Sequence, residues 1–431
     1  MDLLKNIFKG DKVIWIIFLC LCLISIVEVF SAASTLTYKS GDHWGPITQH
    51  SVILMVGAVL VVLMHNIPYK WFQVFPVFLY PISLLLLAFV TIMGIVTGDR
   101  VNGAARWMTF MGVQFQPSEL AKMAIIIAVS FILSKRQDDE GANPKAFKYI
   151  MIITGIALLL IAPENLSTAM LLFGVVFIMM FIGRVAAKKL LLLVGGIVLI
   201  GAIGVGTVVA IPAKTLHNTP GLHRLETWQN RIKGFFDKEE VPAARFDIDK
   251  DAQIAHARIA IATSNVVGKG PGNSIQRDFL SQAFSDFIFA IVIEEMGLIG
   301  GIFVVFLYLW LLIRAGRIAQ KCDRTFPAFL VMGIALLLVS QAILNMMVAV
   351  GLFPVTGQPL PLISKGGTST LINCAYIGMI LSISRYTARL EEQKAHDARI
   401  QMQIEAGTAE SQAQTAVEPT SEMLNNDSKF E

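Results

Sequence analysis

The chain has 431 residues, of which 55% are hydrophobic and only 15% are charged. Soluble domains carry about 25% charged residues, so this composition excludes an ordinary water-soluble protein. The formal net charge of +4 gives no reason to expect a nucleic-acid partner. The four cysteines imply no disulfide framework, because none of them lies in the large polar segment of the chain.

Ten apolar runs predict an all-α membrane protein, because about 20 apolar residues in a helix cross the roughly 30 Å hydrocarbon core of a bilayer. The first run follows three lysines and has features of a signal peptide, but nine further runs favour a retained helix. The predicted spans are residues 13–33, 50–66, 71–96, 121–134, 147–162, 166–183, 188–212, 286–313, 327–352 and 370–385.

Basic residues recur in alternate short loops, which places both termini in the cytoplasm under the positive-inside rule. The long segment 213–285, between the seventh and eighth spans, then forms a large extracytoplasmic loop. Its Trp228, Phe235 and Phe236 predict that it folds back onto the membrane surface. The basic clusters are Lys5/Lys9/Lys12, Lys70, Lys135/Arg136/Lys145/Lys148, Arg184/Lys188/Lys189, Arg314/Arg317/Lys321/Arg324 and Arg385/Arg389.

These features divide the chain into a cytoplasmic N-terminus (1–12), a ten-span membrane domain (13–386) and a cytoplasmic tail (387–431). The tail is rich in Gln, Ala, Ser and Glu and has few aromatic residues. Such a composition is typical of a disordered segment or a loose helix.

Four polar constellations share the predicted outer face. The first contains Arg106 and Trp107 and continues into Phe-Gln-Pro-Ser-Glu-Leu-Ala-Lys. Pro117 suits the first turn of a helix, and Glu119 and Lys122, three residues apart, can pair there. The alternative is a plain helix start at the membrane edge, with Trp107 in the aromatic belt and Lys122 extending to the headgroups.

The second constellation is a short turn with Glu164 and Asn165, which either lines a cavity or only satisfies the backbone of the turn. The third contains Ser274 and Gln276, followed by Asp286 where the long loop enters the eighth span. Asp is common as a helix N-cap, so Asp286 is either a functional acid or a cap.

Two acids, Glu294 and Glu295, lie about 12 Å further along the eighth span at 1.5 Å per residue. Acids at that depth need a cavity or a partner group, and bracing between helices is the structural alternative. The sequence Gly-Lys-Gly-Pro-Gly at 268–272 is only superficially similar to a phosphate-binding loop, because no strand precedes it. No pair of the seven histidines has the spacing of metal ligands.

The fourth constellation is the segment 351–369, which holds three prolines and four glycines and so cannot form a continuous helix. Irregular backbone at membrane depth is tolerated only where protein or a watery cavity covers it. A re-entrant loop that lines a site is therefore favoured over a plain turn. Its candidate residues are Ser364, Lys365, Thr368 and Ser369.

In their order along residues 13–386, these motifs resemble the SEDS family of shape, elongation, division and sporulation proteins. The resemblance rests on Gly-Ala-x-Arg-Trp with Phe-Gln-Pro-Ser-Glu-x-x-Lys, on Asp-Phe-Ile-Phe-Ala with Glu-Glu-x-Gly, and on Pro-Val-Thr-Gly-x-Pro-Leu-Pro with Ile-Ser-x-Gly-Gly-x-Ser. Ser-Ile-Gln-Arg at 274–277 is more similar to the division-type branch than to the elongation-type branch. The chain departs from the family pattern at three places: it has Ser281-Gln282 for the usual Pro-Glu, Asn165 for the usual Asp, and Lys365 for a common aromatic residue. Asp286 is retained.

The resemblance implies a peptidoglycan glycosyltransferase that polymerises lipid II at the outer face of the bacterial cytoplasmic membrane. It also implies a class B penicillin-binding protein and other division or elongation membrane proteins as partners. The essential acid of the family falls on Asp286. The residues expected to bind the substrate are Arg106, Trp107, Ser118, Glu119, Lys122, Glu164, Asn165, Ser274, Gln276, Ser364, Lys365, Thr368 and Ser369.

The implied chemistry needs one carboxylate. Glycoside hydrolases generally need two, one of them to protonate a poor leaving oxygen, but a diphosphate leaves already ionised. Asp286 is therefore the expected base for the acceptor hydroxyl. The candidates for stabilising the charge on the diphosphate are Arg106, Lys122 and Lys365, the helix start near Ser118, and a bound Mg²⁺ or Mn²⁺ ion. No organic cofactor is expected.

Two other functions are weighed against this one. A flippase or transporter for the lipid-linked precursor also suits broken helices and intramembrane acids, but the sequence has no inverted repeat and its polar motifs gather at one face. A scaffold would dock division proteins through the long loop and the tail.

Overall fold

The computed structural model describes residues 9–40, 45–96, 108–110, 113–138, 141–211, 229, 248–280 and 285–424. Each of the ten predicted spans coincides with a helix, so the all-α class is confirmed. These helices are α2 (Lys12–Ser40), α3 (Gly45–Asn66), α5 (Phe75–Val96) with the short α4 (Tyr69–Phe72) before it, α6 (Pro117–Lys135), α7 (Pro144–Ile161), α8 (Leu166–Ile182), α9 (Ala187–Ala210), α13 (Ile288–Gln320), α14 (Thr325–Ala349) and α15 (Gly367–Leu424).

Within the described ranges, nine helices are long and apolar enough to cross a membrane. The tenth, α8, has 17 residues, or about 26 Å at 1.5 Å per residue, slightly less than the hydrocarbon thickness. The chain is thus a multi-span membrane protein, and the tenth span stays a prediction.

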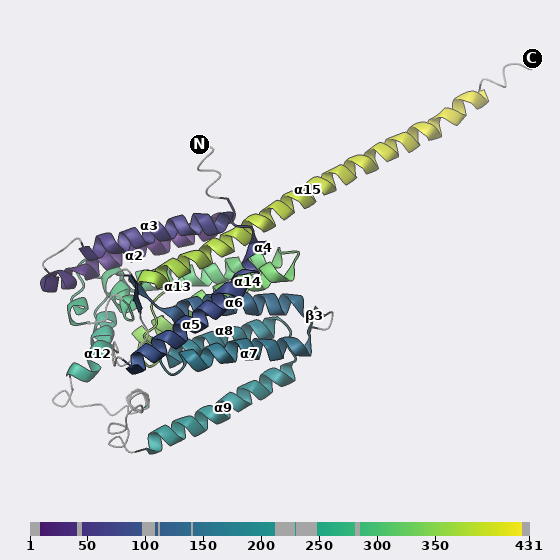
Figure 1. Cartoon of the computed structure of the whole chain (residues 1–431). Helices are drawn as coiled ribbons and strands as arrows, with labels where there is room; N and C mark the ends of the chain where they lie inside the picture. The colour runs from purple at the N-terminus through teal and green to yellow at the C-terminus, as the bar shows by residue number, and fades with distance from the viewer. Residues whose placement is uncertain are drawn as a thin grey trace, which may run out of the picture.

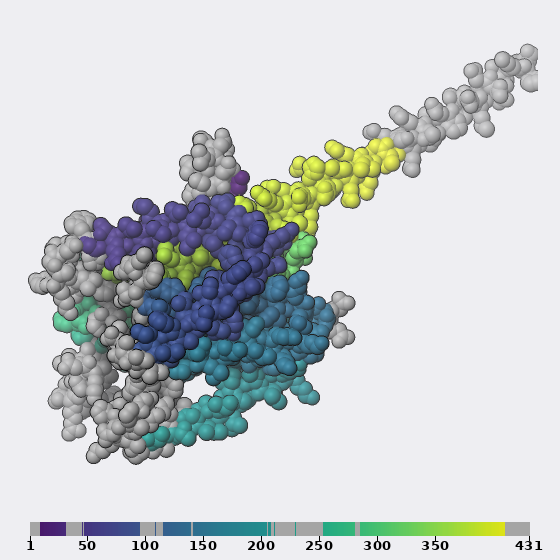
Figure 2. Space-filling view, in the orientation of Figure 1, coloured from purple at the N-terminus to yellow at the C-terminus, as the bar shows by residue number. Residues whose placement is uncertain are grey.

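The helices form one bundle, with α12 (Ile248–Ala262) at one end and β3 and the projecting part of α15 at the other (Figure 1). Helix α6 packs against α5, α8 and α14. Its residues 121–130 are all buried, as expected for a helix surrounded by protein on every side. At the edge, α9 leaves side chains such as Leu191 and Leu192 largely exposed, which suits contact with lipid (Figure 2).

Two small hairpins interrupt the helical pattern. Strand β1 (Met108–Phe110) pairs with β2 (Val113–Phe115) directly before α6, and β3 (Gln137–Asp138) pairs with β4 (Gly141–Ala142) after it. The sequence does not predict these hairpins, because strands of two or three residues are too short to show an alternating pattern.

A break in α13 lies where the segment before this helix packs against it. Gly297 has φ 74° and ψ −176°, a region that is essentially restricted to glycine. The loop before the helix fills the gap with backbone hydrogen bonds, from Lys269 N to Glu294 O (3.0 Å) and from Gly270 N to Glu295 O (2.8 Å). The break therefore anchors the last part of the long loop against α13.

Replacing Gly297 with alanine is expected to destabilise the protein by at least about 1–3 kcal/mol, the cost of this backbone region for other residues. A Cβ atom here would lie 2.3 Å from Val266 O and 2.5 Å from Gly268 N, both backbone atoms that cannot move aside cheaply. Denaturant unfolding in detergent measures the effect. Gly316→Ala on the same helix is the control, because its Cβ would meet nothing within 4 Å; equal stability of the two variants would contradict the prediction.

Helix α15 continues far beyond the bundle, to Leu424. Side chains from Glu391 to Ala409 are all exposed, and Glu391 still pairs with Lys321 at the C-cap of α13 at 2.8 Å. Thr387 is the last buried residue of the helix, and the division into a membrane domain and a cytoplasmic tail at residue 387 stays a prediction.

Candidate functional site

Asp286 lies in the turn before α13 and is half-buried. Its backbone carbonyl accepts a hydrogen bond from Asn345 Nδ2 at 2.9 Å. The same amide group donates to Gln358 O at 2.8 Å, and Asn345 is itself buried. One side chain of α14 therefore ties the aspartate turn to the proline- and glycine-rich loop 351–366.

A second link joins the same two segments. Ser364 Oγ donates to Ser285 O at 2.7 Å and accepts from Leu360 N at 2.7 Å. Ser364 is thus held inside the loop and positions the residue directly before Asp286. The third and fourth sequence constellations, almost eighty residues apart, meet at one place.

The loop 351–366 is covered by protein, in the way its composition requires. Its carbonyl groups accept hydrogen bonds from side chains of the surrounding helices: Gln341 Nε2 donates to Pro359 O at 3.0 Å, Ser25 Oγ to Ile363 O at 2.7 Å, and the Tyr308 hydroxyl to Pro361 O. These donors replace the hydrogen bonds that a helix would make, which is what allows irregular backbone to stay at this depth.

The first constellation begins α6 as predicted, with Pro117 at the first helical position. Glu119 and Lys122 form the expected ion pair at 2.7 Å, and Lys122 Nζ also donates to Gln341 Oε1 at 2.9 Å. Both charged side chains are almost fully buried. The interpretation that Lys122 extends to the headgroups is therefore wrong, because the side chain points across the bundle to α14.

Asn165 caps α8, where its Oδ1 accepts from Thr168 N at 3.1 Å. Thr168 Oγ1 in turn accepts from Gln358 Nε2. The second constellation therefore reaches the proline- and glycine-rich loop, and through Asn345 it reaches Asp286. Glu164 precedes the cap at the rim of a pocket.

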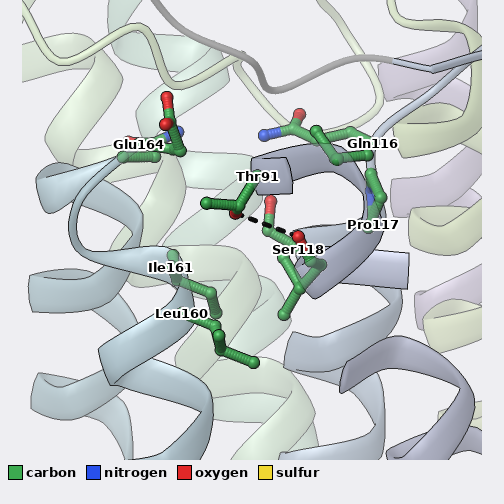
Figure 3. A pocket seen from close by; sticks show the side chains of 10 residues that line it. Thr91, Gln116, Pro117, Ser118, Leu160, Ile161 and Glu164 are labelled. Atoms are coloured by element: carbon green, nitrogen blue, oxygen red, sulfur yellow. Dashed lines mark hydrogen bonds between the residues drawn. The ribbon is translucent and has the colours of Figure 1, made fainter. Parts of the chain in front are cut away.

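This small pocket, of about 20 Å³, lies between the end of α5, the start of α6, the end of α7 and the start of α8 (Figure 3). Gln116 and Glu164 stand on opposite sides of its rim, and Leu160 and Ile161 lie deeper (Figure 3). Ser118 Oγ and Asn165 Nδ2 are buried and have no hydrogen-bond partner within the described part of the chain. The pocket therefore combines an apolar floor with unused polar groups.

Ser274 and Gln276 bind other protein groups. Ser274 Oγ donates to Glu294, and Gln276 Oε1 lies 2.7 Å from His256 Nδ1 on α12. Glu294 also pairs with Lys269 at 2.6 Å. Glu295 accepts from the backbone of Gly272 and Ser274 and from the Ser31 hydroxyl. The two acids have partner groups, as predicted, and they brace the loop against α13.

The remaining predicted residues divide into two groups. Thr368 Oγ1 accepts from Gln116 N at 3.4 Å, which joins the starts of α15 and α6. Ser369, the next residue, is buried. Lys365 is half-buried, and this burial lowers the pKa of its ammonium group. Arg106 and Trp107 lie outside the described residues, as do the loop aromatics at 228, 235 and 236.

Sequence reasoning missed Gln341 and Asn345, the two residues of α14 that hold the site together. The available signal was two amides spaced i, i+4 inside an apolar span, where polar side chains are costly without partners. Thr168 lies three residues after Asn165, and Gln358 lies inside the segment 351–369, but neither was predicted as a site residue.

The fold and the site together define a multi-span α-helical membrane protein with a polar site built at one end of its bundle. The chain belongs to the FtsW/RodA/SpoVE family of cell cycle proteins, whose model matches residues 11–389. This confirms the family resemblance drawn from the motifs.

Two curated relatives show how far the similarity extends. The chain is 33% identical to the probable peptidoglycan glycosyltransferase FtsW of Trichlorobacter lovleyi, over 89% of this chain and 96% of that protein. It is 32% identical to the protein of the same name from Geobacter sp. strain M18, over 88% of this chain and 98% of that protein. Both names agree with the division-type resemblance of the 274–277 stretch.

The fold is also found in solved structures. A chain from a structure that describes polymerisation and crosslinking by a peptidoglycan synthase complex is similar with a TM-score of 0.69 and 23% identity, over 88% of this chain and 99% of that chain. The rod shape determining protein RodA of Thermus thermophilus is similar with a TM-score of 0.59 and 23% identity, over 88% of this chain and 98% of that chain.

Proposed function

We propose that this chain is a peptidoglycan glycosyltransferase that polymerises lipid II at the outer face of the bacterial cytoplasmic membrane, with Asp286 as general base. The activity is supported by the curated relatives, which carry this name and match almost the whole chain. The role in cell division or cell shape follows from the same family membership.

The observation that best supports Asp286 as the base is its place in the hydrogen-bonded network. Asn345 and Ser364 fix the backbone of the aspartate turn from two sides, at 2.9 Å and 2.7 Å. A carboxylate on a fixed turn at the edge of the bundle can take the proton of an acceptor hydroxyl. Because the leaving diphosphate is already ionised, one acid is sufficient.

The pocket between α5, α6, α7 and α8 suits the junction between the lipid tail and the polar part of this substrate. Its floor of Leu160 and Ile161 would contact the isoprenoid chain, and Ser118 and Asn165 offer polar atoms that the protein leaves unused. The N-terminus of α6 lies at the same pocket, and the positive end of its helix dipole favours a negatively charged group there.

A cation must offset the charge that builds up on the diphosphate. Lys122 is already paired with Glu119 inside the protein, so it is less suited to this role. Lys365 and Arg106 are the other predicted cations. The described residues contain no group of three or more His, Cys, Asp or Glu side chains able to hold a metal. Asp286 could still bind a Mg²⁺ or Mn²⁺ ion as the single protein carboxylate, with the other ligands supplied by substrate oxygens. Mg²⁺ is commonly held by one or two carboxylates plus phosphates.

Replacing Lys365 with glutamine is expected to lower turnover by about 10²-fold, the low end for removing one group that stabilises developing charge. Burial lowers the pKa of this ammonium group, so a diphosphate beside it would make the buried charge more favourable. Initial polymerisation rates on lipid II measure the effect. Unchanged turnover would remove Lys365 from the proposal.

The proposed orientation has both termini in the cytoplasm, with the site on the outer side. A class B penicillin-binding protein and other division or elongation membrane proteins are the proposed partners. The structure similar to this fold that describes a peptidoglycan synthase complex supports a partnership of this kind.

The decisive experiment combines the purified chain, its transpeptidase partner and lipid II, with and without divalent cations, and separates the products on a gel. Glycan strands support the proposal. If no strands form and labelled lipid II instead moves between leaflets, the chain is a flippase.

A further inference from the structure

A cavity of about 490 Å³ is lined by residues of α2, α13 and α15. It lies where α15 leaves the bundle, at the end opposite the candidate site; Figure 1 shows this part of the helix. Three segments far apart in sequence form the walls of the cavity: the start of α2, the end of α13 and the emerging part of α15. Its charged lining residues are Asp11, Lys12, Arg314, Arg317, Lys321 and Glu391.

The charges in this cavity do not balance. Arg314 pairs with Asp11 at 2.6 Å, and Lys321 pairs with Glu391 at 2.8 Å. Lys12 and Arg317 line the same space, and neither makes an ion pair with another residue of the described chain. The cavity therefore holds two cations that no protein anion compensates.

Hydrogen bonds fix the walls of the cavity. Asp11 Oδ1 accepts from the backbone of Val13 and Ile14, and Asp11 N donates to Ser384 Oγ of α15 at 2.8 Å. The carboxylate that caps α2 is the same one that binds Arg314. The start of α2 is thus locked to α13 and α15, and the two uncompensated cations sit on a fixed frame.

Each of the two cations stands at the end of a row of exposed apolar side chains on its own helix, here called a stripe. On α2, Lys12 is followed by Ile16 and Leu19, and on α13, Arg317 is preceded by Ile313 and Leu309; these spacings of three and four residues place each set on one helix face. The four apolar side chains are between 44% and 57% exposed. Helices α2 and α13 contact each other, so the two stripes belong to neighbouring helices of the bundle.

We propose that this cavity binds an anionic phospholipid, with its phosphate between Lys12 and Arg317 and its acyl chains along the two stripes. Basic pockets between helices on the cytoplasmic side are suited to acidic headgroups, because the inner leaflet carries anionic lipids. The assignment rests on the proposed orientation and is independent of the catalytic mechanism. An acidic peptide would satisfy the two cations but would leave the stripes uncovered, so the lipid accounts for more of the surface.

The test is native mass spectrometry of the full chain released from detergent, with phosphatidylglycerol and phosphatidylcholine added in competition. The wild type is expected to retain phosphatidylglycerol preferentially. Removing both charges, in Lys12→Gln/Arg317→Gln, is expected to weaken that retention about 30-fold, or about 2 kcal/mol at 1.4 kcal/mol per tenfold. Arg317→Gln alone keeps the N-terminal lysines and is expected to show part of the loss.

The matched control is Lys148→Gln/Lys188→Gln, which removes two exposed cations from the same end of the bundle but away from the cavity. Retention equal to that of the wild type supports a specific site. An equal loss in the control, or no preference for phosphatidylglycerol in the wild type, overturns the proposal. Displacement of the lipid by inorganic phosphate or by a soluble poly-glutamate peptide would overturn it as well, because the acyl chains would then contribute nothing.

Discussion

Replacing Asp286 with asparagine is expected to lower the rate of lipid II polymerisation by about 10²–10⁴-fold, the usual contribution of a positioned general base. Asparagine has nearly the same shape but cannot accept a proton from the acceptor hydroxyl. The hydrogen bond from Asn345 goes to the backbone carbonyl of Asp286, so the substitution keeps it. Rates with the transpeptidase partner present, under single-turnover conditions, isolate the chemical step.

The control is Asp278→Asn, another acid of the segment before α13, whose side chain is 55% exposed. This variant should polymerise like the wild type. Asp286→Glu keeps a carboxylate at the wrong distance, so it should recover only part of the rate. Should Asp286→Asn match the wild type, the base lies elsewhere and the proposed mechanism fails.

Replacing Lys122 with methionine is expected to destabilise the protein by about 3–5 kcal/mol, because it leaves the Glu119 carboxylate buried without its partner. The substitution also removes the donor to Gln341 Oε1. The free energy of unfolding in detergent, from a denaturant titration, measures this loss. Polymerisation should fall with it, because Gln341 also holds the carbonyl of Pro359 in the loop beside Asp286.

The double variant Glu119→Gln/Lys122→Met separates charge from packing. With both charges removed, no ion is left buried alone, and much of the lost stability should return. Lys148→Met, at an exposed position, should change little. If Lys122→Met is as stable as the wild type, the pair is not the structural bridge between α6 and α14 that its geometry indicates.

The spans could be predicted because each depends on local sequence alone. A run of apolar residues must form a helix in lipid, since no water is present to satisfy its backbone groups. The start of α6 at Pro117 and the cap at Asn165 are likewise local, and both agree with the sequence. The family motifs were readable for the same reason, as contiguous strings of residues.

The contacts across the bundle could not be predicted from one sequence. Lys122 and Gln341 are 219 residues apart, and nothing in the local pattern of either helix indicates that they meet. The two amides of α14, Gln341 and Asn345, are visible in the sequence, but nothing there indicates that Asn345 binds the Asp286 turn and Gln358. The wrong interpretation of Lys122 as a headgroup contact has the same cause. A lysine near a helix start can extend to the headgroups or bind a buried partner, and the local sequence does not distinguish the two.

The sequence by itself therefore determined the membrane class, the order of the spans and the family, because these follow from composition, run length and contiguous motifs. Only the tertiary structure decided which polar groups share a site, which acids brace the loop and which cations lack a partner. The physical reason is that burying a polar group inside a helical bundle is favourable only with a partner, and that partner is chosen by packing between helices remote in the chain.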